Sequence, residues 1–72
     1  MRDLTDFNLI KIGDTVEAIF WEDGIIVHRL IKIGVLIDGV FYGEDIDDIL
    51  TQGEEYPYEI AEDNFIKIIE GE

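Results

Sequence analysis

Residues 15–33 decide the fold, and they read TVEAIFWEDGIIVHRLIKI. From Val16 to Phe20, apolar side chains alternate with others, which is the two-residue period of a β-strand with one buried face. Asp23-Gly24 follows, and Asp-Gly between two apolar runs is a strong signal for a two-residue hairpin turn. Ile25 to Ile33 then forms the return strand, so this stretch predicts a β-hairpin.

Similar signals continue along the chain. Residues 35–42 predict a second hairpin about the turn Asp38-Gly39, with Gly34 as a break after the first hairpin. Further short strands are predicted at residues 7–12, 56–60 and 65–69. The chain is therefore expected to be mainly β, with about five to six strands.

One segment departs from the alternation. Ile46, Ile49 and Leu50 have the i, i+3, i+4 spacing of an apolar helix stripe, and Gly53 is well placed to end a helix. Carboxylates in the first turn are favoured by the positive end of the helix dipole. We therefore expect one short helix at about 44–50, within a single domain that covers residues 1–72.

Two segments resemble parts of a known architecture. Residues 11–18, KIGDTVEA, resemble the opening of many SH3-like barrels, in which a Gly-Asp turn precedes an alternating strand. Residues 56–68, YPYEIAEDNFIKI, are similar to the end of such barrels, with a strand, a tight acidic turn and a short final strand. The resemblance implies a small SH3-like barrel, and a twisted antiparallel sheet of the same strands is the alternative. Such barrels host many functions, so the resemblance concerns architecture alone.

The charge of the chain is strongly negative and unevenly distributed. Its 72 residues include 18 Asp and Glu against 5 Lys and Arg, which gives a formal net charge of -13. Residues 33–66 contain ten acids and no Lys or Arg, and apolar residues are interleaved with these acids. The acids therefore belong to the folded body. A surface of this sign opposes direct binding to DNA, RNA or an anionic bilayer.

Composition also bears on location. The chain has no Cys, which excludes disulfides and thiolate metal sites and suits a reducing cytosol. No stretch approaches the roughly 18 uncharged apolar residues of a membrane span. The first residues lack the basic-then-apolar layout of a signal peptide. We expect a cytoplasmic protein, in the host cytosol if a bacteriophage encodes it.

Catalytic chemistry has few candidates. His28 is the only imidazole, and the chain has no Ser or Cys that it could activate. The glycines do not form a phosphate-binding loop. The acids of residues 44–48 lack the spacing of a calcium loop. We therefore expect no enzymatic activity, no cofactor and no metal site.

The strand at 25–33 carries apolar residues on both faces, although so small a domain has little material to cover the second face. Pairing of one face of this strand, or of its edge, with a second copy would explain the pattern, so we expect a homodimer. The expected dimer strand presents Ile25, Val27, Arg29, Ile31 and Ile33.

The remaining positive signal is the acidic surface. Carboxylates on alternate strand residues lie about 6.5 Å apart and can present a row of charge like that of a nucleic-acid backbone. By size, charge and fold type, the chain resembles the DNA-mimic inhibitors that bacteriophages make against host proteins. Targets of that group include histone-like nucleoid-associated proteins, restriction systems, uracil-DNA glycosylases and RNA polymerase.

This resemblance implies a non-enzymatic inhibitor that occupies the basic DNA-binding surface of a host protein and blocks DNA binding. A nucleoid-associated histone-like protein is our leading target class. The expected phosphate stand-ins are Glu44, Asp45, Asp47, Asp48, Glu54, Glu55, Glu59, Glu62 and Asp63.

Two other functions remain open from the sequence. The first is a phage-type protein–protein inhibitor or adaptor of a host enzyme unrelated to nucleic acids, with Trp21, Tyr42 and Tyr58 as aromatic anchors. The second is a structural small β-barrel subunit whose charge only keeps it soluble. Salt separates mimicry from an aromatic interface, because only charge mimicry should weaken steeply between 50 and 200 mM.

Overall fold

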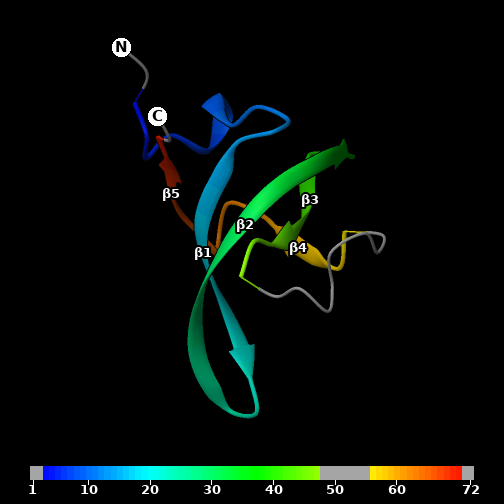
Figure 1. Ribbon diagram of the computed structural model, residues 1–72. Coiled ribbons are helices and arrows are strands. Elements are labelled where there is room, and N and C mark those ends of the chain that lie inside the picture. The colour runs from blue at the N-terminus through cyan, green and yellow to red at the C-terminus, as the bar shows by residue number, and fades with distance from the viewer. Residues whose placement is uncertain (1–2, 48–55, 71–72) are drawn as a thin grey trace.

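The chain folds into one antiparallel sheet (Figure 1). The computed structural model describes residues 3–47 and 56–70. Its strands are β1 (Thr15–Glu22), β2 (Ile25–Ile37), β3 (Val40–Asp45), β4 (Tyr58–Ile60) and β5 (Phe65–Ile69). Their order across the sheet is β4-β3-β2-β1-β5. The mainly β prediction is confirmed, and within the described residues no helix has the length and apolar character of a membrane span.

Both predicted Asp-Gly turns are present. Asp23 and Gly24 have φ of 53° and 81°, and Asp38 and Gly39 have φ of 51° and 80°. Positive φ at both central residues is the mark of the type I′ turn, whose twist matches that of the flanking strands. The register runs directly from Glu22 opposite Ile25, so the first turn fixes the pairing of β1 with β2.

The predicted break at Gly34 is wrong, because β2 continues through it to Ile37. The pairing with β3 shifts between Ile33 and Val35, so Gly34 is the extra residue of a β-bulge. A Cβ at this position would collide with the ring of Tyr56, which lies against the glycine. The bulge bends β2 and lets one long strand serve both hairpins.

The strand predicted at 7–12 is also wrong. A short 3-10 helix, η1 (Phe7–Leu9), begins there, and the carboxylate of Asp6 accepts a hydrogen bond of 2.9 Å from the amide of Asn8. The Phe7 ring makes edge contacts with Phe41 and Phe65, at centroid distances of 5.4 and 5.7 Å. Aromatic packing against the core thus determines the path of this segment.

The helix predicted at about 44–50 is contradicted where the structure describes it. Glu44 and Asp45 are the last residues of β3, and Ile46 and Asp47 form a turn. Asp45 pairs with Ile31 of β2, so strand hydrogen bonds replace helical ones at this position. Residues 48–50 lie outside the described part of the chain.

The core occupies the inner face of the curved sheet. Alternate residues of every strand point into it, and η1 covers one end. Its buried apolar side chains are Ile10, Val16, Ala18, Ile31, Ile33, Phe41, Ile60 and Ile68. Each fully buried Ile or Val contributes about 1.5–3 kcal/mol, so this small set supplies most of the stabilisation.

Gly43 allows β2 and β3 to approach each other, and this closeness can be tested. A Cβ at Gly43 would meet the Lys32 carbonyl and would lie 2.7 Å from Cγ2 of Ile31. We expect Gly43→Ala to lower the free energy of unfolding by about 2 kcal/mol, measured by urea titration. Gly39→Asn is the control, since that position is open and Asn tolerates positive φ. A loss at Gly39 equal to that at Gly43 would contradict this packing.

Candidate functional site

Three exposed carboxylates lie on β4 and on the turn that follows it. Glu59 is on β4, and Glu62 and Asp63 follow in the turn that leads to β5. We call Glu59, Glu62 and Asp63 the acidic edge. Within residues 3–47 and 56–70, no Lys or Arg forms an ion pair with any of them. Their negative charge is therefore available to a partner.

The turn that carries the acidic edge is held in place by Asn64. Its Oδ1 accepts a hydrogen bond of 2.7 Å from the Ala61 amide, and its Nδ2 donates one of 3.0 Å to the Glu59 carbonyl. The Asn64 carbonyl accepts another from the Ile19 amide of β1, at 2.9 Å. The backbone beneath the three carboxylates is therefore fixed from both sides. Asn is a typical turn residue, but the sequence position of Asn64 alone does not predict these three hydrogen bonds.

Glu44 lies next to the acidic edge on the outer face. Tyr42 of β3 is opposite Glu59, so Glu44 occupies the diagonal position, at a Cα separation of about 7–8 Å. Lys32 of β2 lies opposite Glu44 on the other side and offsets part of its charge. The structure thus brings Glu44 beside Glu59. Because Lys32 lies opposite Glu44, the surface around Glu44 is less negative than the acidic edge.

The other expected phosphate stand-ins divide into three cases. Asp47 is exposed, in the turn after β3. Asp48, Glu54 and Glu55 lie outside the described residues. Asp45 does not belong on the outer surface at all, because it is 2% exposed and points inward. The prediction that Asp45 presents charge to a partner is therefore wrong.

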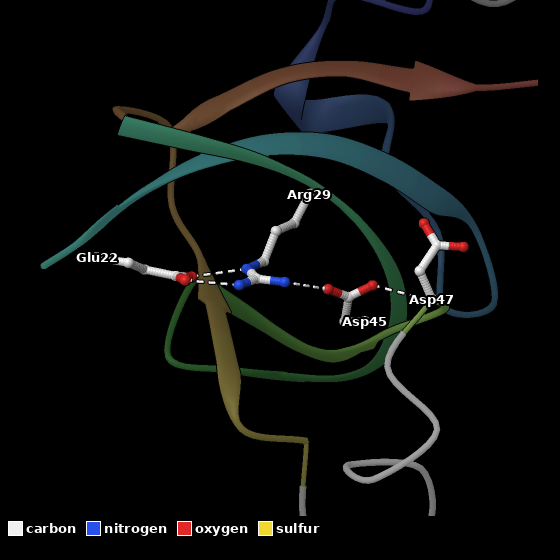
Figure 2. Close-up of polar contacts among 4 residues, drawn as sticks. All are labelled: Glu22, Arg29, Asp45 and Asp47. Atoms are coloured by element: carbon white, nitrogen blue, oxygen red, sulfur yellow. Dashed lines mark hydrogen bonds and ion pairs between the residues drawn. The ribbon is translucent and has the colours of Figure 1, made fainter. Parts of the chain in front are cut away.

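Asp45 is buried because Arg29 reaches it from the neighbouring strand (Figure 2). Arg29 Nη1 donates to Asp45 Oδ2 at 2.6 Å, while its Nε and Nη2 donate to the two carboxylate oxygens of Glu22, also at 2.6 Å. Asp45 Oδ1 accepts the amide of Asp47 at 2.8 Å. We call Arg29, Glu22 and Asp45 the Arg29 cluster; it connects β1, β2 and β3.

Aromatic rings complete this environment. The Arg29 guanidinium lies 5.5 Å from the ring centroid of Tyr58, within the range of a cation–π contact. Tyr58 in turn packs edge-on against Phe20, with centroids 5.1 Å apart. The cluster is thereby tied to β4 as well. Hydrogen bonds to the two carboxylates raise the pKa of Arg29, and the same bonds from Arg29 lower the pKa of Glu22.

A sequence signal for this cluster exists. Arg29 occupies an alternate position between Val27 and Ile31, on one of the two apolar faces of the strand. An inward-facing cation must have a buried anion as its partner. That argument alone predicts an inward Asp or Glu on an adjacent strand, although it does not select which one.

The three expected aromatic anchors do not form one surface. Trp21 is 74% exposed, on the outer face near the first turn. Tyr42 is half-buried on the outer face of β3, opposite Glu59. Tyr58 points inward and holds Arg29. Of the three, Trp21 has the exposure of a contact residue.

The expected dimer strand is largely an interior surface. Ile31 and Ile33 are 0% and 1% exposed in the core of their own chain, and Arg29 is held in its cluster. This set therefore cannot face a second copy, with the exception of Ile25, which is exposed, and Val27, which is half-buried. Most of that face is therefore core of its own chain, and the homodimer itself stays a prediction.

His28 makes a surface contact. Its Nδ1 lies 2.9 Å from Oε2 of Glu17, diagonally across β1 and β2 on the outer face. Among the described residues, no group of three His, Asp or Glu side chains is arranged to hold a metal ion.

Comparison of the chain with protein families, curated proteins and solved structures gives no match.

Removing Arg29 should expose the dependence of the fold on its cluster. We expect Arg29→Met to lower the free energy of unfolding by about 3 kcal/mol, because Asp45 is left charged and buried. The double variant R29M/D45N should be more stable than R29M, since the buried anion is gone. Urea titration with circular dichroism measures both. A double variant no more stable than R29M would contradict this account.

The Glu22 interaction should depend on pH. The folded-state pKa of Glu22 lies below its ordinary value of 4.5, so its stabilisation is present above that value and is lost as the pH falls through the folded pKa. We expect the difference in unfolding free energy between wild type and Glu22→Gln to be fully present above pH 4.5 and to shrink as the pH is lowered through the folded-state pKa of Glu22. A constant difference for Glu22→Gln at all pH values would contradict the assignment.

Proposed function

We propose that this protein is a non-enzymatic DNA mimic. Its acidic surface occupies the basic DNA-binding surface of a partner protein and so excludes DNA. The observation that supports the proposal most is the acidic edge, in which Glu59, Glu62 and Asp63 are exposed and unpaired within the described residues. A cationic groove that normally holds phosphates offers the complementary charge.

The internal use of cations strengthens this proposal. Arg29 is engaged by two carboxylates inside the protein, and Lys32 lies opposite Glu44. Few cations are then left to neutralise the surface of a chain whose net charge is -13. The electrostatic field of this net negative charge attracts a basic partner from a distance and raises the rate of association at low salt.

Rigidity distinguishes this surface from a solvated acidic tail. The carboxylates of the acidic edge stand on a strand and on a turn fixed by Asn64. Glu44 and Glu59 are held at a diagonal spacing of about 7–8 Å by the β3–β4 register. Charges that are already fixed in position lose less conformational entropy when they bind a partner. The target class that we favour is a histone-like nucleoid-associated protein, on the resemblance to bacteriophage inhibitors.

The proposal predicts a site-specific effect of charge removal. The triple variant E59Q/E62Q/D63N should compete with fluorescent duplex DNA for a histone-like protein at least about tenfold less well than wild type. Its control, D23N/D38N/E70Q, also removes three negative charges, but from exposed positions scattered over the described surface. It should change competition by less than about threefold. Fluorescence anisotropy gives the half-inhibitory concentration, and inhibition should weaken steeply from 50 to 200 mM salt.

Two results would contradict the proposal. Equal losses in the two triple variants would show that net charge alone matters. A wild-type protein that displaces DNA from none of a panel of basic DNA-binding proteins would reject DNA mimicry.

A further inference from the structure

We propose that two copies of this protein associate through the free edge of β2 at the projecting end of the first hairpin. The interface is an antiparallel pairing of residues 26–28 with the same residues of a second copy. This inference concerns self-association and does not rest on the proposed function.

The first hairpin extends beyond the rest of the sheet (Figure 1). β1 pairs with β2 along the whole hairpin, from Glu22 opposite Ile25 to Thr15 opposite Lys32. β3 pairs with β2 only from Ile31 onward. In the described structure, the edge of β2 from Ile25 to Leu30 is therefore covered on the β3 side only where the Ile46 amide reaches the Leu30 carbonyl.

The alternation of the strand shows which backbone groups face this edge. The Ile33 amide and carbonyl bond to Asp14 and Gly13, on the β1 side. The amide and carbonyl of alternate residues point the opposite way, and the bond from Ile46 to Leu30 confirms that direction. The backbone groups of Ile26 and His28 therefore point to the open edge, where they can pair with another strand.

A two-fold axis beside Val27 gives every backbone amide and carbonyl of Ile26 and His28 a hydrogen-bond partner. It places Ile26 opposite His28 of the second copy, and each such pair exchanges two backbone hydrogen bonds. Val27 then faces Val27 of the second copy on the inner side. On the outer side, Ile26 of one copy lies beside His28 of the other, and Trp21 flanks Ile26 on the next strand.

The proposed interface lies among the most exposed apolar side chains of the described surface. Trp21 and Ile25 are 74% and 62% exposed, the highest values among its large apolar residues, and Ile26 is 50% exposed. Clustered apolar exposure at one projecting point is typical of an interaction site. The edge from Ile25 to Leu30 also lacks the Lys or Pro residues that natural proteins use to prevent edge pairing.

Charge identifies the occupant as a second copy. The projecting end, residues 21–29, contains Glu22 and Asp23 against Arg29, which pairs with Glu22 and with the buried Asp45, whereas the whole chain carries -13. Two such acidic molecules meet with least repulsion at the part of the surface where acids are fewest. Repulsion between the more distant acidic regions is screened beyond a Debye length of about 8 Å at physiological salt. A basic partner is attracted to the acidic edge instead.

Self-association of the full chain tests the inference. Sedimentation equilibrium should show a species of twice the 8.3 kDa chain mass. Trp21 is the only tryptophan, so its emission should shift to shorter wavelength as concentration rises and the hairpin becomes buried. The dimer should strengthen between 50 and 200 mM salt, whereas binding to a basic partner weakens.

Two variants of β2 locate the interface. Ile26→Lys should raise the dimer dissociation constant at least about tenfold, because it places a charge in both halves of the interface. Ile37→Lys is a matched control, with the same charge change, on the same strand and at an exposure of 51%. It should leave the dissociation constant within about threefold. Trp21→Ser is a second interface variant at a highly exposed position, and circular dichroism verifies folding of all three.

Each other outcome overturns the inference. A wild-type chain that remains monomeric at millimolar concentration in 200 mM salt rejects self-association. A dimer that survives both Ile26→Lys and Trp21→Ser, or that Ile37→Lys weakens equally, rejects the β2 edge as its location.

Discussion

The ion pair between Arg29 and Asp45 is the constraint on which the arrangement of the sheet depends. A buried carboxylate is strongly unfavourable unless a cation and hydrogen bonds accompany it, and Arg29 provides the cation from the adjacent strand. By also holding Glu22 and lying against Tyr58, the same guanidinium connects four strands. One of the few cations of the chain is thus used inside the sheet, where it holds neighbouring strands together. It is therefore not available to neutralise the acidic surface.

The shape of the sheet separates the molecule into two regions with different chemistry. Around β3 and β4, the core is closed by Phe41 and Ile60, and the outer surface carries carboxylates on a fixed backbone. The far end of the first hairpin has little core beneath it and exposes Trp21 and Ile25. If both proposals hold, a symmetric dimer carries two acidic edges on one body, and binding at both sites of a partner would gain from effective concentration.

Local sequence signals predicted much of this fold, and their limits have physical causes. The Asp-Gly turns are decided by the φ values of two residues, so Asp23-Gly24 and Asp38-Gly39 could be read directly. The bulge at Gly34 and the strand that continues after Gly43 could not be predicted in this way. They depend on contacts with Tyr56 and Ile31, which are distant in sequence. The outward-facing acids at Glu59, Glu62 and Asp63 followed from the sequence, whereas the inward turn of Asp45 depends on which strand lies beside Arg29. The face of β2 expected to pair with another chain became core for the same reason.

The Arg29 cluster has a consequence for behaviour on heating. The hydration of charged groups becomes less favourable as temperature rises, so the free energy needed to keep Arg29 and Asp45 away from water decreases. The stabilisation from the apolar core does not grow in the same way over that range. The relative contribution of this single ion-paired cation to the stability of the fold therefore increases in a warmer environment.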